Sequence, residues 1–172
     1  INEHIIKYVS ERNAKDINWK EYGCEYLIDA TGAHLTTEKS LNHNVDYVII
    51  SAPPKDNTPS FIFGANHEKY NGEKIIAGSS CTTNCISPML KLLNDEYTIS
   101  SCNFTTIHAT TATQNTVDII KKSNRTNRSI INNIIPHTTG ASSAVVNIFP
   151  ELANKIYGTS VRVPVLYCSL LD

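Results

Sequence analysis

The chain has 172 residues, of which 41% are hydrophobic and 18% are charged, and its formal net charge is −1. These values are ordinary for one or two globular domains and exclude a disordered or fibrous protein. The net charge is close to zero, so the chain lacks the excess of basic residues that nucleic-acid binders carry, and no nucleic-acid partner is expected. No apolar run approaches the roughly 20 residues that span a bilayer, which excludes a transmembrane role.

The ends and the cysteines indicate the origin of the chain. It begins at Ile1, its one methionine is Met89, and no charged and then apolar leader opens it, so we expect a fragment of a longer protein without a signal peptide. An odd number of cysteines at irregular spacing is a poor disulfide framework and predicts a reducing, cytoplasmic location. The five are Cys24, Cys81, Cys85, Cys102 and Cys168.

The first half contains three short apolar runs, at residues 25–29, 45–51 and 74–78. They are rich in Ile, Val and Tyr and lack clean alternation, which is typical of strands buried on both faces of a parallel sheet. A helix is expected over residues 36–42, where Thr-Thr-Glu lies near the start. The alternation of strands and helix predicts an α/β architecture.

A longer helix is expected from about residue 82 to residue 97, with Pro88 inside it as a tolerated kink. A fourth apolar run follows at residues 102–108. Beyond it the chain becomes rich in Thr, Ser and Asn and includes a polar loop at residues 113–130. This change of texture predicts a domain boundary near Cys81.

The sequence Ser-Ser-Cys-Thr-Thr-Asn-Cys at residues 79–85 places Cys81 between a predicted strand and the first turn of a predicted helix. Free N–H groups and the positive end of the helix dipole favour a thiolate there and could hold an oxyanion. The alternative is a buried structural cysteine. Cys81 and Cys85 could also be half of a zinc site, but no second Cys pair or clustered His supplies further ligands, so no metal is expected.

His108 ends the fourth apolar run, so its imidazole should emerge at a strand end, where parallel sheets place functional groups. A Cys and a His brought together by the fold form an ion pair that activates the sulfur, and the imidazole can then move a proton. Considered alone, His108 could equally be a structural histidine.

Several colinear motifs resemble phosphorylating glyceraldehyde 3-phosphate dehydrogenases. They are ATG at 30–32, ISAP at 50–53, GANHEKY at 64–70, SCTTNC at 80–85, TIHATTATQ at 106–114, NIIP at 133–136, TTGA at 138–141, PEL at 150–152 and VRVP at 161–164. The resemblance implies α/β then α+β structure: an incomplete doubly wound (Rossmann) parallel sheet in residues 1–81, then part of a mixed-sheet catalytic domain in residues 82–172.

The resemblance also implies residue roles. Cys81 would attack the aldehyde of glyceraldehyde 3-phosphate and His108 would move the protons, giving a thioester that inorganic phosphate converts to 1,3-bisphosphoglycerate. Thr111 and Arg162 would hold the substrate phosphate, and Ser80, Thr139 and the backbone of Gly140 the attacking phosphate. Thr82 belongs to the same implied phosphate-binding set. Without the resemblance, Arg162 would be read as a surface ion pair and Thr139-Gly140 as an ordinary turn.

The implied cofactor is NAD, with NADP left open. Thr31, Gly32 and Ser51 follow predicted strands and match positions that line the cofactor site. No G-x-G-x-x-G occurs, and we expect that fingerprint, with the acidic residue that recognises the adenine ribose, before Ile1.

The loop at 113–130 keeps Arg125 and Arg128 but surrounds them with bulkier residues than is usual, and Ser143 stands where a Lys is usual. The full-length protein is expected to be a homotetramer, while the isolated chain should be poorly folded and inactive. Two alternatives remain open: a truncated or diverged relative that serves as a binding module, and a related dehydrogenase for erythrose 4-phosphate or a semialdehyde.

Overall fold

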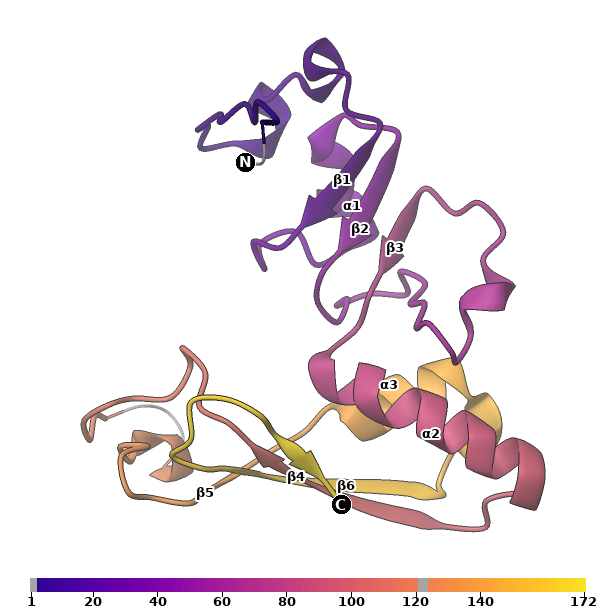
Figure 1. Ribbon diagram of the computed structural model, residues 1–172, viewed down its shortest axis with the longest axis vertical. Coiled ribbons are helices and arrows are strands. Elements are labelled where there is room, and N and C mark those ends of the chain that lie inside the picture. Colours follow the sequence, from indigo (N-terminus) through magenta and orange to yellow (C-terminus); the bar gives the residue numbers. More distant parts are fainter. Residues whose placement is uncertain (1–2, 121–123) are drawn as a thin grey trace. The chain divides into compact units, whose positions relative to one another are not determined.

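The computed structural model describes residues 3–120 and 124–172 (Figure 1). The chain divides into two compact units, which are described separately below. The first unit comprises Ile1–Phe61 and His67–Ser79, and the second comprises Ile62–Asn66 and Ser80–Asp172. Within the described residues, no helix combines the length and apolar character needed to cross a membrane.

The first unit is built on a three-stranded parallel sheet in the order β1-β2-β3. The strands are β1 (Tyr26–Asp29), β2 (Tyr47–Ile50) and β3 (Ile75–Ala77), and each lies inside one of the three predicted runs. Ile50 and Ala77 are paired in register and have no exposed surface. Because the strands are parallel and aligned, their carboxyl ends lie along one edge, as the α/β prediction requires.

The helix expected over residues 36–42 is divided in the structure. Helix α1 (Thr37–Ser40) begins after Thr36, whose hydroxyl accepts a hydrogen bond from the N–H of Lys39. A 3-10 turn, Leu41–His43, continues it and ends at Asn44 in the left-handed conformation. The unit also has 3-10 turns at Ala14–Asp16, Trp19–Tyr22 and His67–Lys69.

The second unit has a mixed four-stranded sheet in the order β5-β6-β4-β7. Its strands are β4 (Cys102–His108), β5 (Ile135–His137), β6 (Ile156–Arg162) and β7 (Leu170–Leu171). The two long strands, β4 and β6, are parallel, and the short outer strands run antiparallel to them. This arrangement is the expected α+β sheet.

Helices α2 (Cys81–Tyr97) and α3 (Ala141–Ile148) contact each other and lie on one side of this sheet (Figure 1). Helix α2 starts one residue earlier than predicted and runs through Pro88 to the predicted end. Short 3-10 turns at Asn124–Asn127 and Pro150–Leu152 complete the unit.

The core of the second unit joins the helices to the sheet. Ile86 and Leu90 of α2 pack in one cluster with Val145 of α3 and Phe104 of β4, each at most 4% exposed. Burial of such side chains contributes about 1.5–3 kcal/mol each. The cluster therefore fixes the start of α2 against the strand that ends at His108.

The ring of Phe104 on β4 lies over Gly158 on β6, which has no side chain. A Cβ at Gly158 would lie 2.3 Å from Cζ of Phe104, its partner in the register, so the ring occupies the space of the missing methyl group. The same register sets His108 opposite Arg162 at the carboxyl end of both strands.

Candidate active site

A pocket of about 240 Å³ lies in the second unit, at the N-terminus of α2 and beside the end of β4. Its lining mixes thiol, hydroxyl and imidazole groups with an apolar wall. The lining residues are Cys81, Thr82, Cys85, Thr106, His108, Ser169, Leu170 and Leu171. The pocket thus brings the predicted nucleophile and the predicted base together.

Cys81 is the first residue of α2 and is exposed. Ser80 caps the helix, because its Oγ accepts a hydrogen bond from the N–H of Thr83 at 3.2 Å. The Oγ of Ser80 also lies 2.7 Å from the Oγ1 of Thr83. This position places the sulfur at the positive end of the helix dipole, beside backbone N–H groups that have no partner within the helix.

The imidazole of His108 faces this sulfur. The Sγ of Cys81 lies 3.5 Å from the Nε2 of His108, which is hydrogen-bonding distance for sulfur. Fixed at the end of β4, His108 is only partly exposed. The two side chains are 27 positions apart in the sequence, and the packing of α2 on β4 brings them together.

Arg162 lies on the opposite side of the imidazole ring. Its Nη1 is 2.6 Å from the Nδ1 of His108 and 3.0 Å from the carbonyl oxygen of Ala109. Because a guanidinium only donates, Nδ1 accepts in this contact and the ring proton lies on Nε2, toward Cys81. Nδ1 also lies 2.8 Å from the carbonyl oxygen of Ala109, which would accept its proton if Arg162 moved away.

The environment of Arg162 suits an anion. Burial lowers the pKa of its guanidinium, and the negative charge of a Cys81 thiolate opposes that shift. Its Nε is buried without a hydrogen-bond partner among the described residues. A buried donor without a partner costs free energy, and an incoming anion would supply the missing acceptor.

The other predicted phosphate-binding residues lie in turns around these strands and helices. Thr111 follows β4, where its hydroxyl bonds to the side chain of Gln114 at 3.0 Å. Thr139 and Gly140 precede α3; the Oγ1 of Thr139 accepts from the N–H of Ala141 at 3.2 Å, and Gly140 is the N-cap. Thr82 lines the pocket. The hydroxyls of Thr111 and Thr139 are hydrogen-bonded within their own turns, and whether these residues converge on an anion stays a prediction.

The sequence analysis did not identify the wall formed by Ser169 and β7. The Oγ of Ser169 accepts the N–H of Ala109 at 3.0 Å, and Leu170 and Leu171 pair with β4 opposite Ile107 and Thr106. A two-residue apolar run carries no specific signal. Only the strand pairing shows that these residues close the pocket.

The residues expected at the cofactor site lie in the first unit. Thr31 and Gly32 follow β1 and Ser51 follows β2, so all three lie at the carboxyl edge of the parallel sheet, where open α/β sheets bind ligands. Gly32 has a φ of +72°, which glycine adopts without strain. Whether this edge binds a dinucleotide stays a prediction, and no G-x-G-x-x-G turn for a pyrophosphate occurs in the 172 residues.

Comparison with known proteins identifies the relatives of this chain. The family model for the C-terminal domain of glyceraldehyde 3-phosphate dehydrogenase matches residues 80–172. The chain belongs to the glyceraldehyde 3-phosphate dehydrogenase family. This finding confirms the resemblance seen in the sequence motifs, and the mixed sheet of the second unit agrees with it.

Members of this family match the first unit as well as the second. Glyceraldehyde-3-phosphate dehydrogenase 1 of Trichoderma koningii is 46% identical over 171 residues, covering 97% of this chain and 51% of the relative. The cytosolic enzyme of Leishmania mexicana is 42% identical over 176 residues, covering 100% of this chain and 53% of the relative. The chain thus spans about half the length of these curated relatives.

Proposed function

We propose that the complete chain containing these residues is an NAD-dependent, phosphorylating glyceraldehyde 3-phosphate dehydrogenase of glycolysis. The observation that carries the proposal is the row of three groups in the second unit. The Sγ of Cys81 lies 3.5 Å from one nitrogen of His108, and Arg162 lies 2.6 Å from the other. A nucleophile, a proton carrier and an anion-binding cation in contact suit the oxidation of a phosphorylated aldehyde.

In the proposed first step, the Cys81 thiolate attacks the aldehyde carbon. A C–S bond forms while the carbonyl electron pair moves to the oxygen, which takes a proton to give a hemithioacetal. A protonated His108 would supply that proton from Nε2, which faces the sulfur, with its Nδ1–H donated to the carbonyl oxygen of Ala109 once Arg162 has moved away. Free N–H groups at the start of α2 stabilise the oxyanion before the proton arrives.

In the oxidation step, His108 removes the hydroxyl proton of the hemithioacetal. The C–O double bond forms as hydride leaves the same carbon, and the product is a thioester on Cys81. Bound NAD⁺ supplies the hydride acceptor. Movement of Arg162 away from His108 would let the ring donate Nδ1–H to the carbonyl oxygen of Ala109 while Nε2 carries the substrate proton.

Inorganic phosphate then attacks the thioester carbon. The C–S bond breaks, the Cys81 thiolate is restored, and the acyl phosphate leaves. Ser80 suits this anion because its Oγ accepts the N–H of Thr83 and lies 2.7 Å from the Oγ1 of Thr83, a contact in which either hydroxyl can donate. When Thr83 donates, the O–H of Ser80 is left to donate to the anion. The hydroxyl of Thr139 and the backbone N–H of Gly140 would complete the pocket.

The phosphate of the substrate is proposed to bind Arg162 together with Thr111, and Thr82 to contact the substrate inside the pocket. Arg162 ends β6 and Thr111 follows the parallel strand β4, so both lie at the same edge of the sheet. A guanidinium binds phosphate with two parallel hydrogen bonds. Phosphate binding would therefore compete with the contact between Arg162 and His108.

NAD would contact Thr31, Gly32 and Ser51 at the edge of the first unit. We place the enzyme in the cytoplasm, as the name of the Leishmania relative states for that protein, and we propose a homotetramer. In the loop at 113–130, Asp118 accepts from Arg128 at 2.6 Å and from the N–H of Ser129 at 2.7 Å. These two hydrogen bonds hold the pKa of Asp118 below its usual range, so the loop keeps this cross-link at neutral pH.

The test is a comparison of Cys81→Ser and Cys24→Ser in the complete chain. NADH formation from glyceraldehyde 3-phosphate should depend on inorganic phosphate and fall about 10²-fold or more in Cys81→Ser. Cys24 is half-buried in the first unit, so its variant should retain the rate. Equal rates in the two variants, or a higher rate with erythrose 4-phosphate or NADP, would contradict the proposal.

A further inference from the structure

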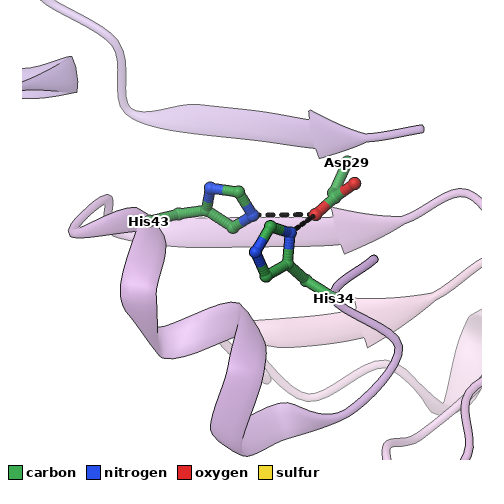
Figure 2. A group of neighbouring side chains, drawn as sticks. All are labelled: Asp29, His34 and His43. Atoms are coloured by element: carbon green, nitrogen blue, oxygen red, sulfur yellow. Dashed lines mark hydrogen bonds and ion pairs between the residues drawn. The ribbon is translucent and has the colours of Figure 1, made fainter. Parts of the chain in front are cut away.

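The first unit contains a second cluster of reactive side chains, at the carboxyl end of β1 (Figure 2). Asp29 is the last residue of β1, His34 lies in the turn after it, and His43 ends the 3-10 turn that follows α1. Figure 2 shows both imidazole rings directed at the carboxylate of Asp29. The sequence motifs and the proposed dehydrogenase reaction leave this cluster without a role.

The contacts within the cluster are short and shielded from water. The Oδ2 of Asp29 lies 2.8 Å from the Nδ1 of His34 and 2.8 Å from the Nε2 of His43. Asp29 is 4% exposed and His43 is 5% exposed. The two rings meet edge to face, with centroids 4.7 Å apart. The Oδ2 of Asp29 is thus the shared hydrogen-bond partner of one ring nitrogen from each histidine.

We propose that Asp29 Oδ2, His34 Nδ1 and His43 Nε2 form a binding site for a divalent transition-metal cation, with Zn²⁺ as the favoured ion. These three ligand atoms all lie within 4.8 Å of one another. Two imidazoles and one carboxylate form a donor set typical of zinc and related ions, and a water molecule can take the fourth position.

The ligand geometry is close to that of a metal-bound site. Ligands around a tetrahedral Zn²⁺, at bond lengths of about 2.0–2.2 Å, lie about 3.3 Å apart. The two nitrogen–oxygen distances of 2.8 Å are those of hydrogen bonds, in which a proton occupies the position of the cation. To hold the ion, the two nitrogen–oxygen distances would open by about 0.5 Å, and the two ring nitrogens, which lie within 4.8 Å of each other, would settle at a similar separation.

Thr31 prepares the carboxylate for this role. Its N–H and O–H both donate to the Oδ1 of Asp29, at 2.8 and 2.6 Å, and leave Oδ2 toward the two histidines. A carboxylate whose second oxygen is held by an outer hydrogen-bond partner is the arrangement found around bound metals.

The imidazoles also fit the ligand role. The Nδ1 of His43 is buried and has no hydrogen-bond partner among the described residues, and Nε2, the other ring nitrogen, is the one that faces Asp29. His34 is partly exposed, and a cavity of about 390 Å³ lined by Asp29, His34 and His43 gives the ion a route from solvent.

The direct test is a cobalt titration of the complete chain after chelator treatment. Iodoacetamide first blocks exposed thiols, including Cys81 and Cys85, so that no thiolate competes for the ion. We expect one Co²⁺ per chain, with the visible spectrum of a four- or five-coordinate N/O site and displacement by Zn²⁺. Absence of saturable binding, or a spectrum with thiolate charge transfer, would overturn the proposal.

Substitutions show which residues bind the ion. His34→Gln should weaken Co²⁺ binding at least tenfold, and Thr31→Val, which loses one outer hydrogen bond, about tenfold. The matched control is His67→Gln, a partly exposed histidine of the same unit outside the cluster, which should bind as the unmodified chain does. Equal affinity in His34→Gln and His67→Gln would show that the three residues form only a hydrogen-bonded network.

A measurement on the unmodified chain keeps the proposal testable if a variant fails to fold. Paramagnetic Co²⁺ should shift the imidazole proton signals of His34 and His43, and it should leave that of His67 in place. Unshifted signals at saturating Co²⁺ would contradict the site. Because neither readout is dehydrogenase activity, failure here would leave the proposed function of Cys81 and His108 untouched.

Discussion

His108 is central to the proposed chemistry because both nitrogens of its ring contact another functional side chain. Its Nε2 faces the sulfur of Cys81 and its Nδ1 faces the guanidinium of Arg162. With Arg162 on Nδ1, the ring proton lies on Nε2 and is directed at the sulfur of Cys81. Loss of the imidazole should therefore affect the reactivity of the sulfur before any substrate binds.

The first prediction concerns His108→Asn in the complete chain. Asn cannot take up or deliver the proton, so alkylation of Cys81 by iodoacetamide at neutral pH should slow about tenfold or more. Peptide mass spectrometry measures this rate at Cys81 and at Cys85, which is exposed on the same helix and serves as the internal reference. An unchanged rate ratio between the two cysteines would contradict the activation of Cys81 by His108.

The second prediction concerns Arg162→Leu. Hydrogen bonds to charged groups contribute about 1.5–3 kcal/mol, so KM for the phosphorylated aldehyde should rise about 10- to 100-fold. At concentrations above those that saturate the reaction, inorganic phosphate should compete with the aldehyde for the same cation, and the variant should lose this competition. If steady-state kinetics show an unchanged KM, Arg162 lies outside the substrate phosphate site.

The sequence predicts roles for Cys81, His108 and Arg162 because each lies in one of the colinear motifs that resemble the family, and the structure brings the three into contact. The contact between Arg162 and His108 could not be predicted, since it depends on the register of β4 against β6. Neither could the cluster of Asp29, His34 and His43. Separations of five and nine residues match no helix or strand period, and a left-handed turn at Asn44 follows the last member.

Among the elements, the parallel pair β4 and β6 determines the geometry of the site. Their register aligns Phe104 with Gly158 and, four residues later, His108 with Arg162. The ring of Phe104 covers Gly158, so a change at this glycine should be transmitted along both strands. The apolar run 102–108 predicted β4. Its pairing with β6 could not be predicted, because β6 is far away in the sequence and no local pattern indicates the pairing.

The third prediction concerns Gly158→Ala. The added Cβ would lie 2.3 Å from Cζ of Phe104, far inside contact distance, so the ring must leave its position in the core. We expect a loss of about 1–3 kcal/mol in the local opening free energy of β4 and β6, measured by amide hydrogen exchange.

Phe104→Leu is the matched background, because its shorter side chain leaves room for the methyl group. The added cost of Gly158→Ala should then be small in a double-mutant cycle. Full additivity of the two changes would show that the ring is not the obstacle.

The predicted helix at 36–42 shows the limit of element prediction. Thr36 provides the expected cap, but only Thr37–Ser40 is α-helical, and the chain tightens into the 3-10 turn that buries His43. Helices this short are not stable from propensity alone. The side-chain contact of His43 with Asp29 favours the tighter turn, and that contact is tertiary.

At the scale of the whole molecule, the 172-residue chain leaves apolar surface uncovered. Strand β1 is an edge strand, and its Tyr26 and Ile28 are 62% and 67% exposed. The chain spans about half of the length of its relatives. Exposed apolar edges promote association with other chains.

The fourth prediction follows for the isolated 172-residue chain. It should elute as aggregate in size-exclusion chromatography and form no NADH from glyceraldehyde 3-phosphate and phosphate. The complete chain is the positive control in both measurements. A monodisperse fragment whose phosphate-dependent activity disappears in Cys81→Ala would show that the two units suffice.

The central claim is that Cys81 forms the covalent intermediate with help from His108. The most direct measurement mixes the complete chain with glyceraldehyde 3-phosphate and NAD⁺ in the absence of phosphate and determines the modified residue by peptide mass spectrometry. We predict one phosphoglyceroyl group on Cys81, which phosphate then releases, and much slower formation in His108→Asn. An unmodified Cys81, or the acyl group on Cys85 instead, would contradict the account.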